Sequence, residues 1–244
     1  MHASRIEPQL SDSAAAAPLL QLAGVEQRYG AFRPVLAGLD LELRRGEFLV
    51  VEGAGGSGKS VLLRLMAGLE RAAAGTVRMA GEDLARLGAA ARSHMRRSIG
   101  YLPPGGGLLL SRTVLENVAL APWAAGAARN EGVRRARVAL ALVGLDADRT
   151  AQTVCSHLPS GERQCVALAR ALVNRPALLL LDDLLTPFDI PSAARILRLL
   201  DPFSESGVTI VVAQRCAEPS TVPLPAPWPA RSRLLRLQDG QVPA

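Results

Sequence analysis

Residues 53–60 of the sequence, GAGGSGKS, have the residue types and the spacing that phosphate binding requires. They match the pattern GxxxxGK[ST], in which glycines let backbone N–H groups wrap around phosphate oxygens. The lysine reaches the outer phosphates, and the final hydroxyl is a ligand for Mg²⁺. The pattern therefore predicts a nucleotide-phosphate loop rather than an ordinary glycine-rich turn. Its candidate binding residues are Gly53, Ala54, Gly55, Gly56, Ser57, Gly58, Lys59 and Ser60.

Lys59 is the single lysine of the chain, whereas arginine stands wherever only positive charge is needed. The ammonium group of lysine is a compact point charge, whereas the guanidinium group of arginine is a planar fork. A lysine at this one position therefore indicates that a compact charge is needed there. A nucleotide at such a loop also needs an acid at the end of a neighbouring strand to hold the metal. Asp182 follows the apolar run ALLLL and supplies that acid, and Asp183 is placed to orient a water molecule.

A second anion site is suggested by residues 158–172, LPSGERQCVALARAL, where a short loop leads into an amphipathic helix. The first turn of a helix exposes unpaired N–H groups and the positive end of the helix dipole. The small residues Ser160 and Gly161 would let an anion approach closely, but Pro159 removes one donor. These residues leave open whether the protein reacts with a phosphate or only holds one.

The elements that would position these residues alternate between strands and helices before and after a helical block. Strands are expected from the apolar patterns within 20–52, at 75–83, 98–102, 177–183 and 208–214. Helices are expected at 60–70, 113–123, 131–145, 162–174 and about 192–200. Residues 217–230 contain five prolines and can form neither a helix nor a central strand. Residues 232–242 predict a small hairpin around Asp239 and Gly240.

Composition narrows the possible classes of protein. The 244 residues are 49% apolar, which is ample for one large packed domain, and the net charge is +6. Because the arginines are scattered without interleaved aromatics, we expect no nucleic-acid partner. The three cysteines lack the spacing of a metal or redox site, which indicates free thiols in a reducing compartment. With neither a signal-peptide pattern nor an apolar run able to span a bilayer, we expect a cytoplasmic protein that reaches a membrane through a partner.

From Leu20 to Val242 the chain resembles the ATP-binding subunits of ABC transporters. The similarity is carried by GAGGSGKS, by LPSGERQCVALARAL beside the family signature LSGGQ, and by LLLLDD beside the family's apolar run ending in Asp-Glu. Tyr29, within QRYG, matches the position at which the family stacks an aromatic ring on adenine. The stretches GEDLARL, RTVLENVAL and ALVNRPALLLLD are most similar to the branch that contains FtsE, LolD and MacB.

This resemblance implies an α/β fold with a P-loop NTPase (RecA-like) core, an antiparallel β subdomain of the ABC type and an inserted helical subdomain at about 105–174. Residues 1–19 would form a flexible N-terminal tail, and 20–244 would form the ATP-binding domain. The implied membrane partner is an ABC permease or an FtsX-like subunit. Through it, the protein would lie on the inner face of the cell membrane.

The resemblance also implies a set of ligands. ATP and Mg²⁺ are the expected cofactors, with Ser60 and Asp182 as the metal-binding side chains. In the family, two subunits sandwich two ATP molecules, each held by the phosphate loop of one subunit and the signature of the other. Ser160, Gly161 and Glu162 would therefore bind the nucleotide of a second subunit, either another copy or a relative.

Departures from the family pattern lie at the reaction centre. Pro159 replaces the signature serine, and Pro104 replaces a glutamine that touches Mg²⁺. Asp183 is one methylene shorter than the family's catalytic glutamate, and Gln214 stands where we expect the histidine that contacts the γ-phosphate. Asp183 and Gln214 remain the candidate catalytic residues. Moving the water-orienting carboxylate by about 1 Å alone can slow a reaction on the order of 10²-fold.

Two functions fit these departures. The first is an ATPase subunit with reduced turnover that couples ATP binding and hydrolysis to a membrane partner. The alternative is a catalytically degenerate regulatory module that holds ATP in a heterodimer, and drift in a duplicated copy would produce similar changes. A P-loop enzyme without a membrane partner is disfavoured because the signature helix would have no use there. Since both main candidates bind ATP, only turnover separates them.

Overall fold

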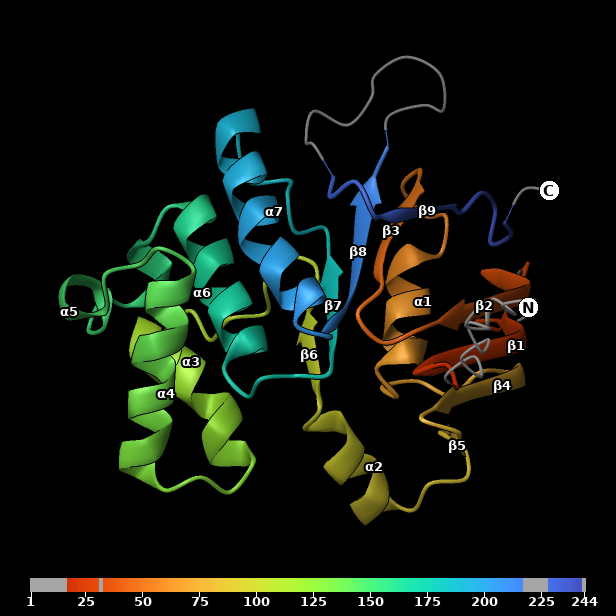
Figure 1. The fold of residues 1–244 in the computed structure, drawn as a ribbon, viewed down its shortest axis with the longest axis horizontal. Coiled ribbons are helices and arrows are strands. Elements are labelled where there is room, and N and C mark those ends of the chain that lie inside the picture. The colour runs from red at the N-terminus through yellow and green to blue at the C-terminus, as the bar shows by residue number, and fades with distance from the viewer. Residues whose placement is uncertain (1–16, 31–32, 217–227, 243–244) are drawn as a thin grey trace, which may run out of the picture.

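A computed structural model describes residues 17–30, 33–216 and 228–242. Its strands form a five-stranded parallel sheet and a four-stranded antiparallel sheet, with helices packed around them (Figure 1). The strands are β1 (Leu20–Gln27), β2 (Leu36–Leu43), β3 (Phe48–Gly53), β4 (Ala74–Met79), β5 (Glu82–Asp83), β6 (Ile99–Leu102), β7 (Leu178–Asp182), β8 (Thr209–Arg215) and β9 (Arg233–Arg236). The helices are α1 (Lys59–Met66), α2 (Ala89–Arg96), α3 (Val114–Ala124), α4 (Arg129–Leu142), α5 (Ala147–Thr150), α6 (Ser160–Leu172) and α7 (Ile190–Glu205), with a short 3-10 turn η1 (Cys155–His157).

The parallel sheet has the strand order β6-β7-β8-β3-β9, so the strand before the phosphate loop lies between β8 and β9. Every residue of β7 is buried, as expected for a leucine run covered on both faces. Because the strands are parallel, their carboxyl ends lie along one edge of the sheet. In register, Asp182 of β7 lies beside Ala213 of β8, and Arg215 of β8 lies beside Gly53 of β3. The two predicted phosphate-site segments therefore end at the same edge.

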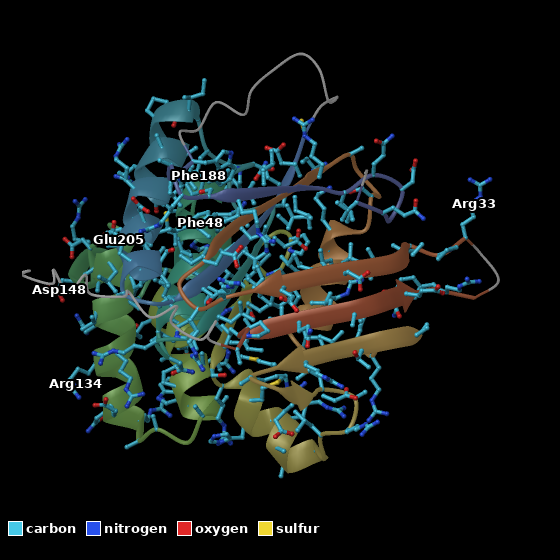
Figure 2. All side chains as sticks on the ribbon, turned by 45° about the vertical axis from the view of Figure 1, so that its right-hand side comes forward. Arg33, Phe48, Arg134, Asp148, Phe188 and Glu205 are labelled. Carbon is cyan, nitrogen blue, oxygen red and sulfur yellow. The ribbon has the colours of Figure 1, made fainter. Side chains whose placement is uncertain are left out.

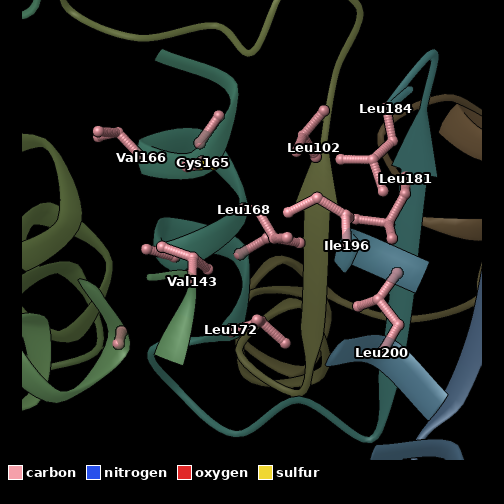
Figure 3. Close-up of a cluster of buried hydrophobic side chains, with 14 of the residues drawn as sticks. Leu102, Val143, Cys165, Val166, Leu168, Leu172, Leu181, Leu184, Ile196 and Leu200 are labelled. Carbon is pink, nitrogen blue, oxygen red and sulfur yellow. The ribbon is translucent and has the colours of Figure 1, made fainter. Parts of the chain in front are cut away.

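The two faces of the parallel sheet pack against different partners. Val50, Leu181 and Val212 point into a cluster that includes α3, α4, α6 and α7, and Figure 3 shows Leu181 meeting side chains of α6 and α7 there. The next residues along β3 and β8, Val51 and Ala213, belong to the second cluster, with α1 and the antiparallel sheet. Successive strand residues point to opposite faces, so the face of each side chain follows from its position.

The antiparallel sheet, in the order β2-β1-β4-β5, covers the far side of α1 (Figure 1). Along β2, Leu39, Leu41 and Leu43 are buried, while Asp40 and Glu42 between them are exposed. This alternation is the pattern of a strand with one face on the core and one in water. Helix α1 is thus held between two sheets, which fixes the phosphate loop at its N-terminus.

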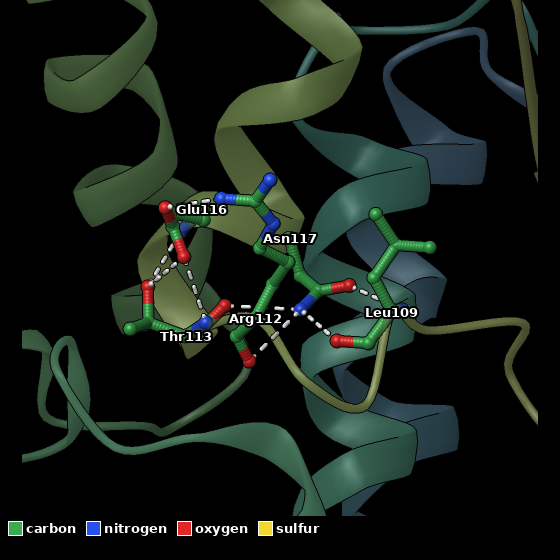
Figure 4. Close-up of polar contacts among 5 residues, drawn as sticks. All are labelled: Leu109, Arg112, Thr113, Glu116 and Asn117. Carbon is green, nitrogen blue, oxygen red and sulfur yellow. Dashed lines mark hydrogen bonds and ion pairs between the residues drawn. The ribbon is translucent and has the colours of Figure 1, made fainter.

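Helix α3 starts with a reciprocal cap. The Thr113 hydroxyl accepts the N–H of Glu116 at 3.2 Å, and a Glu116 carboxylate oxygen accepts the N–H of Thr113 at 3.0 Å (Figure 4). One residue later, the fully buried Asn117 accepts the N–H of Leu109 at 2.8 Å and donates to the Leu109 carbonyl at 2.9 Å. These contacts fix the loop that leads from β6 into the helical block.

The glycine run after Pro104 is held by Arg170 of α6. Its guanidinium donates to the carbonyl oxygens of Gly106 at 2.6 Å and Gly107 at 2.9 Å. Both glycines have positive φ, and a Cβ on Gly107 would lie 2.8 Å from Pro103. This conformation therefore requires glycine. The loop after β6 is thereby tied to the helix that begins at Ser160.

Several sequence expectations are changed by the structure. The helix expected at about 192–200 extends over α7, because Asp189 caps its start by accepting the N–H of Ser192 at 2.9 Å. The expected hairpin around Asp239 and Gly240 is present only as a two-residue turn, closed by an antiparallel bridge between Gln238 and Gln241. The residues before it form β9, which pairs in parallel with β3 instead of continuing the hairpin. Helices α2 and α5 were not expected. The proline-rich segment lies outside the described residues up to residue 227.

The limits predicted for the N-terminal tail and the helical block stay predictions. Residues 1–16 of the tail lie outside the described residues, while the N–H of Leu19 donates to the Leu43 carbonyl at 2.8 Å. Charged side chains cover the outside of the molecule, with Arg134 and Glu205 projecting on the helical side and Arg33 on the opposite side (Figure 2). No helix among the described residues is both long enough and apolar enough to cross a membrane.

Candidate functional site

The phosphate loop joins the end of β3 to the first turn of α1. Gly58, the N-cap of α1, has φ +100, and no side chain caps the first N–H groups of the helix. Lys59 bends back over the loop, where its Nζ donates to the carbonyl oxygens of Gly53 at 2.8 Å and Ala54 at 2.7 Å, and to the Ser57 hydroxyl at 3.1 Å. Burial lowers the pKa of Lys59, and the nearby carboxylates act in the opposite direction. A cation thus stands at an uncapped helix N-terminus, which suits an anion.

The glycines of the loop serve two purposes. A Cβ on Gly53 would lie 2.3 Å from the Leu237 carbonyl oxygen, and one on Gly58 would lie 2.7 Å from the Val35 carbonyl oxygen. Both positions therefore need glycine for close packing. In contrast, no atom of the described residues lies within 4 Å of the Cβ positions of Gly55 and Gly56. These two glycines leave open space in which a ligand can approach the backbone.

An open cavity of about 220 Å³ lies against this loop. Its lining comes from the loop and the first turn of α1, from the carboxyl ends of β7 and β8, and from residues just after β6 and β7. The lining residues are Gly55, Gly56, Lys59, Ser60, Pro104, Asp182, Asp183, Ala213 and Arg215. Five of the residues expected to bind phosphate or metal therefore meet in one place: Gly55, Gly56, Lys59, Ser60 and Asp182. Gly53, Ala54, Ser57 and Gly58 shape the loop without lining the cavity.

Asp182 is the buried acid of the cavity, with 2% of its surface exposed. Burial raises the pKa of Asp182, and the Ser60 hydroxyl lowers it by hydrogen bonding. The Oδ2 atom of Asp182 is buried without a hydrogen-bond partner among the described residues. A carboxylate oxygen that lacks a donor, beside a serine hydroxyl, is the pair of oxygen ligands that suits Mg²⁺. The residues present therefore fit the metal predicted from the sequence.

Asp183 has an unusual backbone for a non-glycine residue, with φ +56. Its N–H donates to the Ala213 carbonyl at 2.8 Å, and its Oδ1 accepts the hydroxyl of Thr186 at 2.5 Å. Its Oδ2 accepts from Nη2 of Arg215 at 2.9 Å. A left-handed backbone persists where the surroundings fix it in several ways, and it often marks a functional position.

Arg215 lines the cavity, whereas Gln214 is not among its lining residues. Gln214 follows Ala213 on β8 and therefore points to the same face as Val212, toward the cluster of α3, α4, α6 and α7. Its Oε1 is buried there without a hydrogen-bond partner among the described residues. The next residue, Arg215, shares the α1 face with Ala213 and lines the cavity.

Ser160, Gly161 and Glu162 form the first turn of α6, outside the phosphate-loop cavity. Pro159 is the N-cap, and no side chain caps the N–H groups that follow it. Gly161 and Glu162 line a separate open cavity of about 510 Å³, together with Pro187, Phe188 and Asp189. A Cβ on Gly161 would lie 3.4 Å from the Phe188 ring. One copy of the chain therefore holds two separate candidate anion sites.

Tyr29 also lies outside the phosphate-loop cavity. Its hydroxyl donates to Glu70 Oε2 at 2.5 Å, and Arg64 Nη2 donates to the same hydroxyl at 3.2 Å. Arg64 is in α1 and Glu70 follows it, so these contacts tie the loop after β1 to the helix that carries Lys59. Tyr29 is 43% exposed as a residue, which leaves it accessible to a ligand.

Gln164 is a positioning residue that was not among the residues selected from the sequence. It is 4% exposed, and its Nε2 donates to the Leu184 carbonyl at 3.2 Å, directly after Asp183. It thereby connects the helix that starts at Ser160 with the turn that holds Asp183. A polar residue inside the otherwise apolar buried stripe of 164–169 was the available signal.

Known proteins are similar to this chain in sequence. The family model for ABC transporters matches residues 36–186. The methionine import ATP-binding protein MetN of Rhizobium etli is 40% identical over 208 residues, which are 85% of this chain and 56% of that protein. The chain thus spans little more than half the length of this relative.

Other relatives are similar over more of their own length. The lipoprotein-releasing system ATP-binding protein LolD of Chromohalobacter salexigens is 44% identical over 168 residues, 68% of this chain and 70% of that protein. The cell division ATP-binding protein FtsE of Escherichia coli K12 is 37% identical over 195 residues, 80% of this chain and 87% of that protein.

Solved structures extend the similarity to the fold. Two dimeric structures of the ATP-binding cassette MJ0796, one of them a post-hydrolysis state bound to ADP and Pi, have TM-scores of 0.79 and 0.80 at 28% identity. They cover 91% of this chain and 96% of theirs. The predicted α/β fold with an ABC-type antiparallel sheet is therefore confirmed. The chain belongs to the ABC transporter family, as an ATP-binding subunit near the FtsE and LolD branch.

Proposed function

We propose that this subunit binds Mg²⁺ and ATP in the phosphate-loop cavity. The observation that carries the proposal is the meeting of Lys59, Ser60 and Asp182 around one open space beside an uncapped helix N-terminus. The loop N–H groups and Lys59 hold the phosphates, and Ser60 and Asp182 hold the metal. When bound, Mg²⁺ neutralises charge on the phosphate oxygens.

Asp183 is the residue placed to act on water. In hydrolysis, the water oxygen forms a bond to the terminal phosphorus, and the bond from this phosphorus to the bridging oxygen breaks. Asp183 orients the water and accepts its proton. Its carboxylate is already bonded to Thr186 and Arg215, and it is shorter than a glutamate. Pro104 follows β6 and also lines the cavity, and its side chain has no donor or acceptor atom that could bind a metal or a phosphate. We therefore propose that hydrolysis is slow.

Two further parts of the proposal concern partners. The first turn of α6 lies outside the phosphate-loop cavity, so its N–H groups reach a nucleotide only on a second subunit. The dimeric MJ0796 structures support such an arrangement. A membrane-spanning permease or FtsX-like subunit is the proposed coupling partner, which would place the protein at the inner face of the membrane. The alternative function is a regulatory ATP-binding module in a heterodimer. It is favoured by the contacts that already occupy the Asp183 carboxylate, a hydrogen bond from Thr186 and an ion pair with Arg215.

Lys59→Ala tests the binding proposal. We expect Mg²⁺-ATP affinity to fall at least roughly tenfold, as expected for loss of a charged hydrogen-bond donor. Titration calorimetry of purified parent and variant measures it. Arg45→Ala, which removes one exposed charge away from the cavity, is the matched control and should bind like the parent. Equal affinities of the Lys59→Ala variant and the parent would refute the assignment of the cavity.

A further inference from the structure

Helix α2 carries a concentration of positive charge on the outside of the molecule. It lies at the lower rim of the view in Figure 1, below β6, and none of its eight described residues is buried. In the sequence, no aspartate or glutamate stands between Asp83 and Glu116, whereas Arg92, Arg96 and Arg97 lie in this stretch. Arg92 and Arg96 are four residues apart, so they lie on one face of the helix. The helix therefore presents positive charge to its surroundings.

Arg71 extends this charge beyond α2. It stands in the turn after α1, and it lines a small cavity of about 70 Å³ together with Arg92 and Leu69. The acid that precedes α2 in the sequence, Asp83, is already paired with Arg86 at 3.3 Å. The residues that form this basic patch are Arg71, Arg92, Arg96 and Arg97.

The charges of the basic patch are not neutralised within the described part of the chain. None of its four arginines belongs to an ion pair there. Arg92 donates to the Leu87 carbonyl at 2.8 Å, which is a neutral acceptor. By contrast, Arg134 and Arg135 of α4 share the carboxylate of Glu131 at 2.5 and 2.6 Å. The four guanidinium groups are therefore available to an external anion.

The shape of the surface favours a fluid anionic partner over a small molecule or a protein. The cavity beside Arg71 is much smaller than the roughly 300–1,000 Å³ of a typical ligand pocket. The exposed residues of α2 are three alanines, Ser93, His94 and Arg96, so the helix has no large exposed apolar side chain for the centre of a protein interface. Lipid phosphates move laterally and need no shaped pocket, and a guanidinium group can bind two phosphate oxygens at once.

Leu69 distinguishes a bilayer from a nucleic acid. It is 46% exposed and lies beside Arg71 and Arg92 at the small cavity. A large apolar side chain next to arginines suits a membrane interface, where the acyl chains lie directly below the charged headgroups. A nucleic-acid surface instead needs aromatic rings on which bases stack, and the basic patch and α2 contain none.

We propose that the basic patch docks on an anionic bilayer surface, with its guanidinium groups on lipid phosphates and Leu69 at the headgroup layer. This inference goes beyond nucleotide binding and does not depend on it. A membrane-spanning partner brings the subunit to the membrane, and the basic patch gives it a direct contact with the lipid. Salt weakens this contact, because exposed charges are screened over a Debye length of about 10 Å at 0.1 M ionic strength.

Sedimentation of the full chain with vesicles tests the docking. The parent should bind vesicles of phosphatidylcholine mixed with phosphatidylglycerol, more weakly as salt is raised, and should not bind phosphatidylcholine alone. In the double variant Arg96→Ala with Arg97→Ala, the partition constant should fall about tenfold or more, since each arginine near an anionic surface contributes roughly fivefold. Arg71→Ala, outside α2, should fall about fivefold by itself. Thermal unfolding and Mg²⁺-ATP titration check that the variants are folded.

Arg134→Ala with Arg135→Ala is the matched control, because it removes the same charge from a pair of adjacent arginines on another helix. It should bind anionic vesicles like the parent. An equal loss of binding in both double variants would show that only net charge matters, and would overturn the proposal. Binding of a DNA duplex as tight as vesicle binding, and equally reduced without Arg96 and Arg97, would assign the patch to nucleic acid instead. Failure to bind Mg²⁺-ATP while vesicle binding persists would refute the proposed function alone.

Discussion

Tyr29 shows how one side chain can serve both packing and binding. Its hydroxyl is held by Glu70 and Arg64, while the residue as a whole is 43% exposed. If the ring stacks on adenine, Tyr29→Phe should bind ATP like the parent, and Tyr29→Ala should bind several-fold more weakly, since aromatic stacking contributes about 0.5–1.5 kcal/mol. Calorimetry with ATP measures both variants. Equally weak binding by Tyr29→Phe and Tyr29→Ala would indicate that the hydroxyl network, and not the ring, matters.

Asp183 limits the rate of hydrolysis in the proposed mechanism. Asp183→Glu extends the carboxylate by one methylene toward the attacking water, and we expect phosphate release to rise by on the order of tenfold or more. Steady-state phosphate release at saturating ATP is the measurement. Asp183→Asn is the matched control, which should release no phosphate while still binding ATP. If turnover stays at background in Asp183→Glu, the regulatory function is favoured.

At the scale of elements, the helices and strands that could be predicted from the sequence are those that a local residue pattern determines. The strand, glycine loop and helix around Lys59 and the apolar strand before Asp182 were expected from residue types alone. The β9 pairing was missed because its partner β3 is far away in the sequence. Arg215 was missed because a shift of one residue along a strand moves a side chain to the other face, and no local pattern fixed that register.

The cap of α3 gives an element-scale prediction with a defined pH dependence. Hydrogen bonds from Thr113 lower the pKa of Glu116, so the ionised carboxylate stabilises the folded state. This stabilisation is fully present above the unfolded pKa of about 4.3, and it is lost as the pH falls through the lower pKa that Glu116 has in the folded protein. Glu116→Gln should therefore unfold at a lower temperature than the parent at pH 7, and the difference should shrink as pH is lowered through 4. Circular dichroism melting curves measure it.

Two variants make this test specific. Thr113→Val removes the hydroxyl of the same cap and should reduce the free energy of unfolding at pH 7 by about 1 kcal/mol. Glu82→Gln changes an exposed acid in β5 and serves as the matched control. A melting difference for Glu116→Gln that is the same at every pH would show that the ionised cap does not act as described.

At the scale of the whole molecule, the separation of the two candidate anion sites leads to a prediction about assembly. Pro159→Ser adds a hydroxyl and an N–H beside the N–H groups of Ser160 and Gly161. In the proposed dimer these donors face the nucleotide of the other subunit, so we expect a larger ATP-dependent dimer fraction at a given concentration. Analytical ultracentrifugation with Mg²⁺-ATP and with ADP measures it. An unchanged monomer–dimer balance with ATP would contradict this assignment.

The place of β3 between β8 and β9 also sets when the cavity can form while the chain is being synthesised. Lys59 leaves the ribosome early, but β3 gains both neighbours only after Arg236 has been made. Arg215 is the lining residue of the cavity that is made last. At about 5–20 residues per second, the ribosome needs roughly 8 to 30 s to pass from Lys59 to Arg215. The antiparallel sheet is complete by Asp83 and can assemble during that time. A nascent chain stalled before Thr209 should therefore hold no nucleotide, although it already contains every glycine of the loop.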